Sequence, residues 1–392
     1  MRILYGFSNC TDSTYNRIVS ERNVSTMVPD QKYHGLLIKG LAQNGAEVMC
    51  FSGLPINRAV TSRKLVREKD EREGNAYYHY ITTINLPVVR QLMIFFGTFF
   101  GVLRAKKDKD TYALCDCLNV ANAYGMTLAC RARKIPVVSI VTDLPDMERS
   151  SGFMRKLNNK LFDKTDAFII LTEQMNERVN PEGKPNIVLE GHVDAEAPLP
   201  ESQTPYELAT GKKVVMYAGS IKKIYGIANL VEGFLRADIP DSELRVYGDG
   251  DYREELERLS EQHPSVCYRG LKSNKEIVEE EQRASLLVNP RPVAPEYTKY
   301  SFPSKNMEYM VSGTPIMTTK LPGMPKEYDP YVYLIEDESF NGIADSLQKV
   351  LTESFEERKE KAEKARAFVL EHKSNLVQAA KIIKFLGTEL SV

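Results

Sequence analysis

The sequence predicts an α/β protein of two doubly wound domains that face each other across a cleft. Apolar strands alternate with helical segments along most of the chain, which is typical of parallel sheets covered by helices. The alternation stops at a proline-rich segment and then starts again. The chain has 392 residues, which is more than one typical core accommodates. In such sheets, ligands bind at the carboxyl ends of the strands.

The first series of elements begins with an apolar strand over residues 2–8, a helix over 30–44 that ends at Gly45, and a strand over 47–52. Its remaining strands are expected over 77–82, 113–118, 136–142 and 167–172, and its remaining helices over 92–103 and 121–133. The prolines that follow cannot join a strand ladder or a helix interior. We therefore expect an N-terminal domain over 1–195 and a linker over 196–212.

The second series repeats this architecture but not the sequence. Its strands are expected over 213–218, 243–247, 266–269, 285–290 and 316–319. Its helices are expected over 228–237, 252–262, 277–283, 340–351 and 354–386. We expect a C-terminal domain over 213–370, with a last helix over 371–392 that packs back on the N-terminal domain.

Composition excludes several classes of function. Lysine and arginine number 52 against 53 for aspartate and glutamate, so no overall basic field favours nucleic acid. The six cysteines are scattered without metal-ligand spacing, and the five histidines form no zinc or catalytic-triad pattern. The N-terminus runs directly into a strand and does not resemble a signal peptide. A reduced, cytoplasmic protein without structural zinc is expected.

The longest apolar stretch, residues 92–103, contains four phenylalanines and is followed by four basic residues. It is shorter than the roughly 20 residues that span a bilayer. It could be a buried helix with a solvated basic end, which the general preference for apolar residues in cores favours. It could instead lie on the inner face of an anionic membrane. Both interpretations stay open.

Three loops that contain glycine follow successive strands of the second series. Their candidate ligand-binding residues are Gly219, Ser220, Lys222 and Lys223, then Gly248 and Gly250, then Gly270 and Lys272. Glycine has no side chain to block a ligand, so each loop could bring its backbone close to one. Each glycine alone is also an ordinary turn residue. Three such loops in order at one sheet edge favour a binding site.

The segment 300–315 is typical of a phosphate-binding helix. Ser301 and Ser304 come just before or at its start, Lys305 adds a full charge, and Glu308 projects from its second turn. A helix N-terminus offers unpaired amides and a positive dipole end to an anion. A carboxylate can accept hydrogen bonds from both hydroxyls of a ribose. A nucleotide diphosphate would therefore suit the segment, although an ordinary amphipathic helix would show the same spacing.

The order of these motifs resembles the family-4 retaining glycosyltransferases of the GT-B architecture, and most closely their bacterial members that build surface polysaccharides. The stretches that carry the resemblance are 215–220, 246–251, 268–270 and 301–316. The resemblance implies two Rossmann-like domains, a nucleoside diphosphate sugar held by the C-terminal half and a saccharide or lipid-linked acceptor held by the N-terminal half. It also implies transfer of a hexose with retention, without a cofactor and without a bound metal.

Three positions depart from the family pattern. Glu308 matches the second of the family's paired glutamates, but Tyr300 occupies the place of the first, so Glu296 either substitutes or is a solvated loop residue. The family's basic pair falls on Ser220 and Tyr225, and Lys222 and Lys223 between them could supply that charge. Asp143 stands where the family often has histidine, and either holds a sugar hydroxyl or caps a turn.

Departure of a nucleoside diphosphate requires positive charge at the phosphates. We therefore assign Lys222, Lys223 and Lys305 to the leaving group and Glu308 to the ribose; Asp143 and Glu296 are further catalytic candidates. On the acceptor side we expect the loops 9–30 and 55–74, with Asn9 and His192, although a structural role is the simpler interpretation of His192. A sugar-nucleotide epimerase and a non-catalytic nucleotide-sugar-binding protein remain the rivals.

Overall fold

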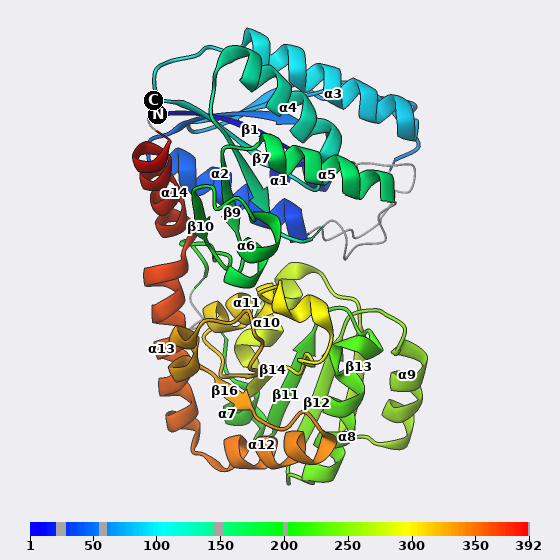
Figure 1. Ribbon diagram of the computed structural model, residues 1–392. Helices are drawn as coiled ribbons and strands as arrows, with labels where there is room; N and C mark the ends of the chain where they lie inside the picture. The colour runs from blue at the N-terminus through cyan, green and yellow to red at the C-terminus, as the bar shows by residue number, and fades with distance from the viewer. Residues whose placement is uncertain (21–28, 55–60, 145–151, 199–202, 391–392) are drawn as a thin grey trace. The chain divides into compact units, whose positions relative to one another are not determined.

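The computed structural model describes residues 1–20, 29–54, 61–144, 152–198 and 203–390 (Figure 1). The chain divides into two compact units. The first comprises Met1–His192 and Ser374–Val392, and the second comprises Val193–Lys373. Each unit holds its own mostly parallel sheet. The prediction of an α/β fold with two such sheets is confirmed.

The N-terminal unit contains an eight-stranded sheet in the order β10-β9-β8-β7-β1-β2-β5-β4. Its strands are β1 (Arg2–Phe7), β2 (Glu47–Ser52), β4 (Glu71–Glu73), β5 (Ala76–Tyr80), β7 (Thr111–Asp116), β8 (Val137–Val141), β9 (Ala167–Ile170) and β10 (Asn186–Val188). Only β4 pairs antiparallel among the described strands of this sheet. A separate antiparallel pair is formed by β3 (Leu65–Val66) and β6 (Thr83–Ile84).

The helices of this unit are α1 (Asp12–Ser20), α2 (Pro29–Gln43), α3 (Pro87–Arg104), α4 (Val120–Arg133), α5 (Gly152–Lys164), α6 (Glu173–Val179) and α14 (Asn375–Glu389). The segment 9–30, expected to be a loop, thus contains α1, while residues 21–28 lie outside the described residues. The whole of β1 is buried, as the central strand of a sheet covered on both faces requires.

The C-terminal unit contains a parallel six-stranded sheet in the order β13-β12-β11-β14-β15-β16. Its strands are β11 (Lys213–Ala218), β12 (Ser242–Tyr247), β13 (Val266–Gly270), β14 (Leu286–Asn289), β15 (Ile316–Thr319) and β16 (Tyr333–Ile335). Its helices are α7 (Tyr206–Thr210), α8 (Ile227–Ala237), α9 (Arg253–Gln262), α10 (Asn274–Arg283), α11 (Ser304–Ser312), α12 (Phe340–Thr352) and α13 (Phe355–Lys373), with short 3₁₀ turns η2 (Lys223–Tyr225), η3 (Glu296–Lys299) and η4 (Lys326–Tyr331).

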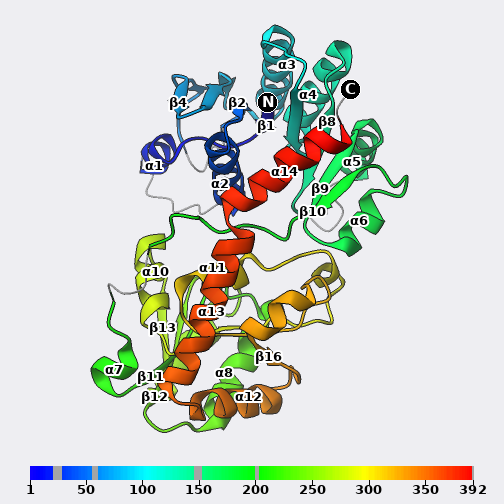
Figure 2. The same ribbon diagram turned by 90° about the vertical axis from the view of Figure 1, so that its left-hand side faces the viewer.

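The last helix belongs to the core of the N-terminal unit. Helix α14 packs against α2, and Figure 2 shows the two helices meeting near the start of α14. The approach is close because Gly40 has no side chain: a Cβ there would lie 2.2 Å from the carbonyl oxygen of Asn375. Ile382 and Leu386 are buried in the same cluster as Ile38. The prediction of one helix over 354–386 is wrong, because α13 ends at Lys373 and α14 begins at Asn375.

Candidate active site

The three glycine loops of the C-terminal unit are joined to one another by backbone hydrogen bonds. They follow β11, β12 and β13 at the carboxyl edge of the sheet. The N–H groups of Gly219, Ile221 and Gly248 donate to the carbonyl oxygens of Tyr247 at 3.0 Å, Asp249 at 3.0 Å and Gly270 at 2.9 Å. Because each loop is tied to the next, the edge is one connected surface rather than three separate turns.

The close approach at two of these glycines is between loops and not toward a ligand. A Cβ at Gly248, whose φ is 134°, would lie 1.8 Å from the carbonyl oxygen of Gly219. A Cβ at Gly250 would lie 2.6 Å from the backbone carbonyl of Ile221. From the sequence we expected both to admit a ligand, and the structure gives a different reason for glycine. Gly270 differs, because no described atom lies within 4 Å of its missing Cβ.

Helix α11 is fixed to the same edge by buried polar contacts. The Tyr309 hydroxyl accepts from the backbone N–H of Ala218, the last residue of β11, at 3.0 Å. The Asn306 amide oxygen accepts from the amide nitrogen of Asn289 at 2.7 Å and from the Thr318 hydroxyl at 3.2 Å. These contacts fix the helix against β11, β14 and β15. Its N-terminus therefore has a fixed position at the carboxyl ends of the strands.

Lys305 and Glu308 form an ion pair at this N-terminus. The Lys305 ammonium lies 2.8 Å from a Glu308 carboxylate oxygen. The Lys305 Cε lies 3.4 Å from the place that a Cβ on Gly219 would occupy. Burial would lower the pKa of Lys305, but the charges of Glu308 and Glu281 and the hydrogen bond to Glu308 outweigh it and raise that pKa above its ordinary value. Lys305 therefore stays charged beside the first glycine loop.

Lys222 and Lys223 are exposed in the loop after β11. The Lys222 ammonium lies 5.9 Å from the centre of the Tyr225 ring, and the backbone N–H of Lys223 donates to Asp251 at 2.7 Å. Neither ammonium lies within 4 Å of a carboxylate among the described residues. The contact with Asp251 ties this loop to the loop after β12. Ser220 is also held in this loop through its backbone, since its carbonyl oxygen accepts a hydrogen bond from the Tyr217 hydroxyl.

Arg291 is a fourth cation at this edge, and it was not among the residues predicted from the sequence. It follows β14 by two residues, and its guanidinium carbon lies 4.7 Å from the centre of the Tyr225 ring and 5.9 Å from that of Tyr297. Stacking on an aromatic face holds an arginine in place without neutralising it. Its position just after a strand end was the signal that could have identified it.

The remaining candidate site residues of the C-terminal unit lie in different local environments. Ser304 is the first residue of α11, and the buried Ser301 hydroxyl has no hydrogen-bond partner among the described residues. Glu296 is exposed at the start of η3, and Tyr300 ends that turn. Lys272 pairs with Glu276 at 3.1 Å, and Glu276 also caps α10 with Ser273. These hydrogen bonds, that to Ser273 above all, lower the pKa of Glu276 to about 2.

The acceptor-side candidates make local contacts. The buried Asn9 amide donates to the carbonyl oxygen of Gln31 at 2.9 Å. The His192 Nε2 lies 2.8 Å from the carbonyl oxygen of Tyr33, and its ring is 4.5 Å from the Tyr33 ring. Asp143 is exposed and accepts from the next backbone N–H, that of Leu144, which matches the turn role. Residues 145–151 after it lie outside the described residues. Structural residues commonly make contacts of this kind.

Burial lowers the pKa of His192 to about 4. In the unfolded chain the imidazole titrates near 6.5, so the unfolded state binds more protons between pH 6.5 and 4. We expect the free energy of unfolding to fall as the pH is lowered through this window, by up to about 3 kcal/mol. Urea denaturation of wild type and of His192→Gln from pH 7 to 4.5 should show a flatter dependence in the variant. Identical slopes would contradict this assignment.

A small hollow lies in the N-terminal unit at the carboxyl ends of β1 and β2. Its lining comes from these strand ends, from α3 and from the start of α4: Phe7, Ser8, Gly53, Leu54, Arg90, Gln91, Ile94, Asn119 and Asn122. The strands that follow β1 in the chain lie on both of its sides, with β2 on one side and β7 on the other, so the winding of the sheet reverses at β1. Doubly wound sheets bind ligands at such a reversal. None of these residues was singled out from the sequence. Asn119 and Asn122, at the start of a helix that follows a strand, were the available signal.

Among the residues that the structure describes, no group of three or more His, Cys, Asp and Glu side chains is arranged to hold a metal ion. The glycine loops, Lys305 and Glu308 all lie in the C-terminal unit. Together they place positive charge and one carboxylate at the carboxyl edge of its sheet.

Residues 200–368 match the protein-family model described as "Glycosyl transferases group 1". No curated protein matches the chain in sequence. Among solved structures, the apo form of the lipopolysaccharide outer core galactosyltransferase WaaB is similar, with a TM-score of 0.64 and 14% identity over 98% of this chain and 99% of that one. Anabaena HepE in complex with UDP has a TM-score of 0.65 and 13% identity over 99% of this chain and 100% of that one.

Sucrose-phosphate synthase from Thermosynechococcus elongatus is also similar, with a TM-score of 0.66 and 12% identity over 98% of this chain and 99% of that one. At these identities the structures establish the fold, and the family model matches within the unit that contains the site. Residues 200–368 therefore match the group 1 glycosyltransferases, and the chain has the GT-B fold.

Proposed function

We propose that the protein transfers a hexose, with retention at the anomeric carbon and without a bound metal, from a nucleoside diphosphate sugar to a saccharide or lipid-linked saccharide. The observation that carries the proposal is the fixed position of Lys305 over Gly219, at the N-terminus of α11. A helix N-terminus and a charged lysine on a glycine loop together suit a diphosphate.

The cations of this edge would act on the leaving group. When the bond between the sugar and the diphosphate breaks, negative charge grows on the phosphate oxygens. Lys305 would balance it from α11, and Lys222 and Lys223 from the loop after β11. Arg291 would add a fourth charge from the end of β14. Glu308 holds Lys305 and the Tyr225 ring holds Arg291 before the reaction begins, so stabilising the charge with these two groups requires little reorganisation.

The proton of the acceptor hydroxyl would go to the departing phosphate, which is the base that a front-face retaining reaction provides. The acceptor would bind in the hollow lined by Ser8, Arg90 and Asn119. Its asparagine and serine side chains offer the donors and acceptors that sugar hydroxyls require. All six cysteines are unpaired, which supports a reducing compartment, and we place the protein in the cytoplasm.

The proposal is tested first by thermal stabilisation. UDP, GDP and ADP sugars are added separately at equal concentration, and the one that the protein binds most tightly raises the melting temperature most. UDP is titrated first, because a similar structure is a complex with UDP. Release of the nucleoside diphosphate only after an acceptor is added would support transfer. Interconversion of sugar nucleotides without an acceptor would instead indicate an epimerase, and binding without turnover a non-catalytic protein.

Glu308→Gln is expected to weaken donor binding by about 10- to 100-fold, because a hydrogen bond to a charged group contributes about 1.5–3 kcal/mol. The substitution keeps the shape of the side chain but removes the charge that faces the ribose and balances Lys305. Isothermal titration with the stabilising nucleotide measures the change. Glu279→Gln, on the exposed side of α10, is the matched control and should bind as wild type. Equal affinities for both variants would remove Glu308 from the site.

A further inference from the structure

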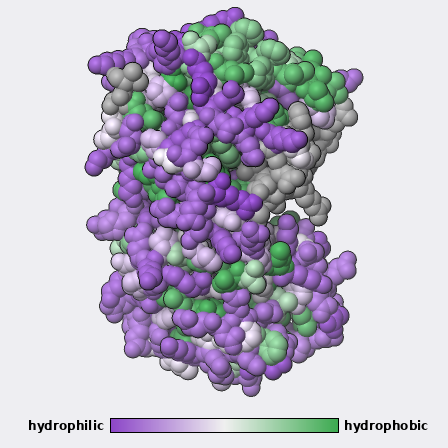
Figure 3. All heavy atoms as spheres, in the orientation of Figure 1, coloured by the Kyte–Doolittle hydropathy of each residue, from purple (hydrophilic) through white to green (hydrophobic). Residues whose placement is uncertain are grey.

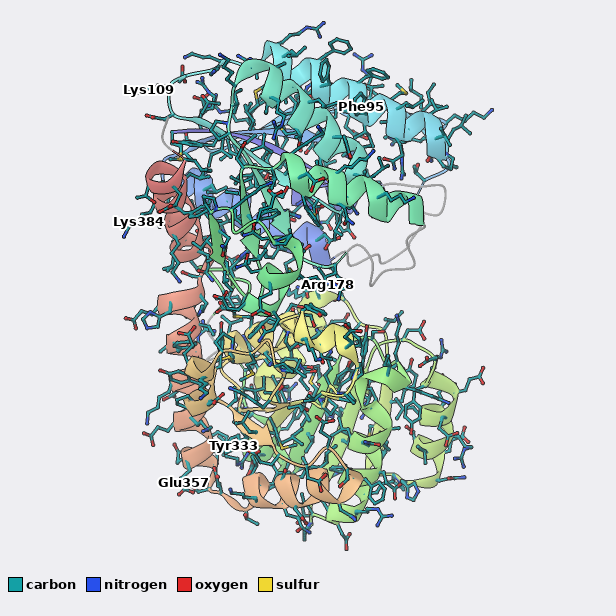
Figure 4. All side chains as sticks on the ribbon, viewed as in Figure 1. Phe95, Lys109, Arg178, Tyr333, Glu357 and Lys384 are labelled. Carbon is teal, nitrogen blue, oxygen red and sulfur yellow. The ribbon has the colours of Figure 1, made fainter. Side chains whose placement is uncertain are left out.

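Helix α3 exposes a continuous apolar stripe, formed by Val88, Leu92, Phe96, Phe100 and Leu103. These side chains recur at helical spacing, and between 36% and 72% of each is exposed. Figure 3 shows hydrophobic residues gathered over α3 and its neighbour α4. Phe95, labelled in Figure 4, also lies on this helix and is half-buried. Large apolar side chains in a row are unusual on a soluble surface.

The stripe cannot turn inward, because the opposite face of α3 is packed closely on the sheet side. Ile94, Thr98 and Val102 are buried there. Gly97 and Gly101 allow the close approach: a Cβ at Gly97 would lie 2.5 Å from Ile81, and one at Gly101 would lie 2.7 Å from Phe51. The sequence favoured a buried helix, but the structure buries one face and leaves the phenylalanine-rich face exposed.

Positive charge lies at the C-terminal end of the stripe. Arg104, Lys106, Lys107 and Lys109 lie within six positions there, Asp108 among them pairs with Arg2, and α3 itself contains no acidic residue. The Arg104 guanidinium carbon is 5.9 Å from the centre of the Phe100 ring, so the charge and the stripe are contiguous. Figure 4 labels Lys109 in the segment that follows the helix. An apolar stripe that ends in a basic cluster complements the surface of an anionic bilayer.

We propose that α3 docks the protein on the surface of an anionic membrane, with its axis in the plane of the interface. The helix is long and apolar enough to cross a bilayer by length and composition alone. Crossing would require α3 to leave the glycine contacts with Ile81 and Phe51, so it lies on the bilayer instead. Arg90 and Ile94 of the same helix line the acceptor hollow, so docking would bring a lipid-linked acceptor to it. That last step rests on the proposed function, whereas the docking does not.

Co-sedimentation with vesicles tests the docking. Wild-type protein should sediment with vesicles of phosphatidylcholine and phosphatidylglycerol, and less with phosphatidylcholine alone. Phe96→Ser/Phe100→Ser should reduce the bound fraction about tenfold or more, because each ring contributes apolar area at the interface. Lys106→Glu/Lys109→Glu should reduce binding only to the anionic vesicles, and added salt should have the same effect on wild type.

Matched controls separate docking from general effects. Leu208→Ser removes an exposed apolar side chain from α7, and Lys359→Glu/Lys364→Glu reverses two exposed charges on α13; both should bind vesicles as wild type. Unchanged melting temperatures would show that the stripe variants are folded, and unchanged nucleotide affinity would separate docking from the donor site. The proposal is overturned if wild type does not sediment, or if the phenylalanine variant sediments equally well. It is also overturned if light scattering finds a dimer that Phe96→Ser/Phe100→Ser dissociates, since a second copy would then cover the stripe.

Discussion

Lys305→Met is expected to lose about 10²- to 10³-fold in kcat/KM, the range found when one preorganised donor to a developing anion is removed. Methionine keeps the apolar stem that packs beside Gly219 but lacks the ammonium. The loss should exceed that of Lys223→Ala, because Lys223 is exposed and screened by solvent whereas Lys305 is partly buried. Release of nucleoside diphosphate under steady-state conditions measures the change.

Lys275→Met is the matched control, because its side chain is 87% exposed on α10 and its ammonium lies 4.0 Å from Glu279. It should retain full activity. If Lys305→Met retained wild-type turnover and nucleotide affinity while Lys275→Met behaved as expected, α11 would not hold the leaving group.

Gly248→Ala is expected to destabilise the C-terminal unit by about 3 kcal/mol or more, which is in the range of severe core and backbone disruptions. The new Cβ would lie 1.8 Å from the carbonyl oxygen of Gly219, and both loops would have to move apart. The donor edge would be disrupted with them, so we also expect nucleotide affinity to fall. Chemical denaturation and isothermal titration measure the two effects.

Gly270→Ala isolates the contribution of backbone conformation. Gly270 also has a positive φ, 67°, but no described atom lies within 4 Å of its missing Cβ. Its substitution should lower the free energy of unfolding only by the strain of an alanine in the left-handed conformation, which is about 1 kcal/mol. Should the two variants prove equally stable, the collision between the loops would not be the reason for glycine at position 248.

Strand and helix periodicity was sufficient to predict two parallel sheets and the order of the loops, because apolar runs such as β1 and β11 are buried whatever surrounds them. The donor-side residues could be located because strand ends and a helix start are local features. Arg291 was missed because its significance depends on Tyr225, 66 positions earlier in the chain. The acceptor hollow was missed for the same reason, since β1, β2, α3 and α4 meet there only in the folded unit.

The sequence pattern was also insufficient where the same spacing of apolar residues fits two different structures. The phenylalanines of α3 fit a buried helix and an exposed one equally, and only the contacts of Gly97 and Gly101 decide which face is covered. No glycine or proline in the sequence marks the end of α13. Ser374 and Asn375 are buried there, and the Asn375 amide donates to the carbonyl oxygen of Leu36, so tertiary contacts end the helix.

The return of α14 to the N-terminal unit has a consequence for synthesis. A ribosome that has translated as far as Lys373 has produced all of the second unit but not all of the first. Until the last segment emerges, Leu37, Ile38 and Leu41 of α2 lack the covering that Ile382 and Leu386 provide. The half of the protein made first is therefore finished last, and the nascent chain carries an uncovered apolar surface while its second half is made.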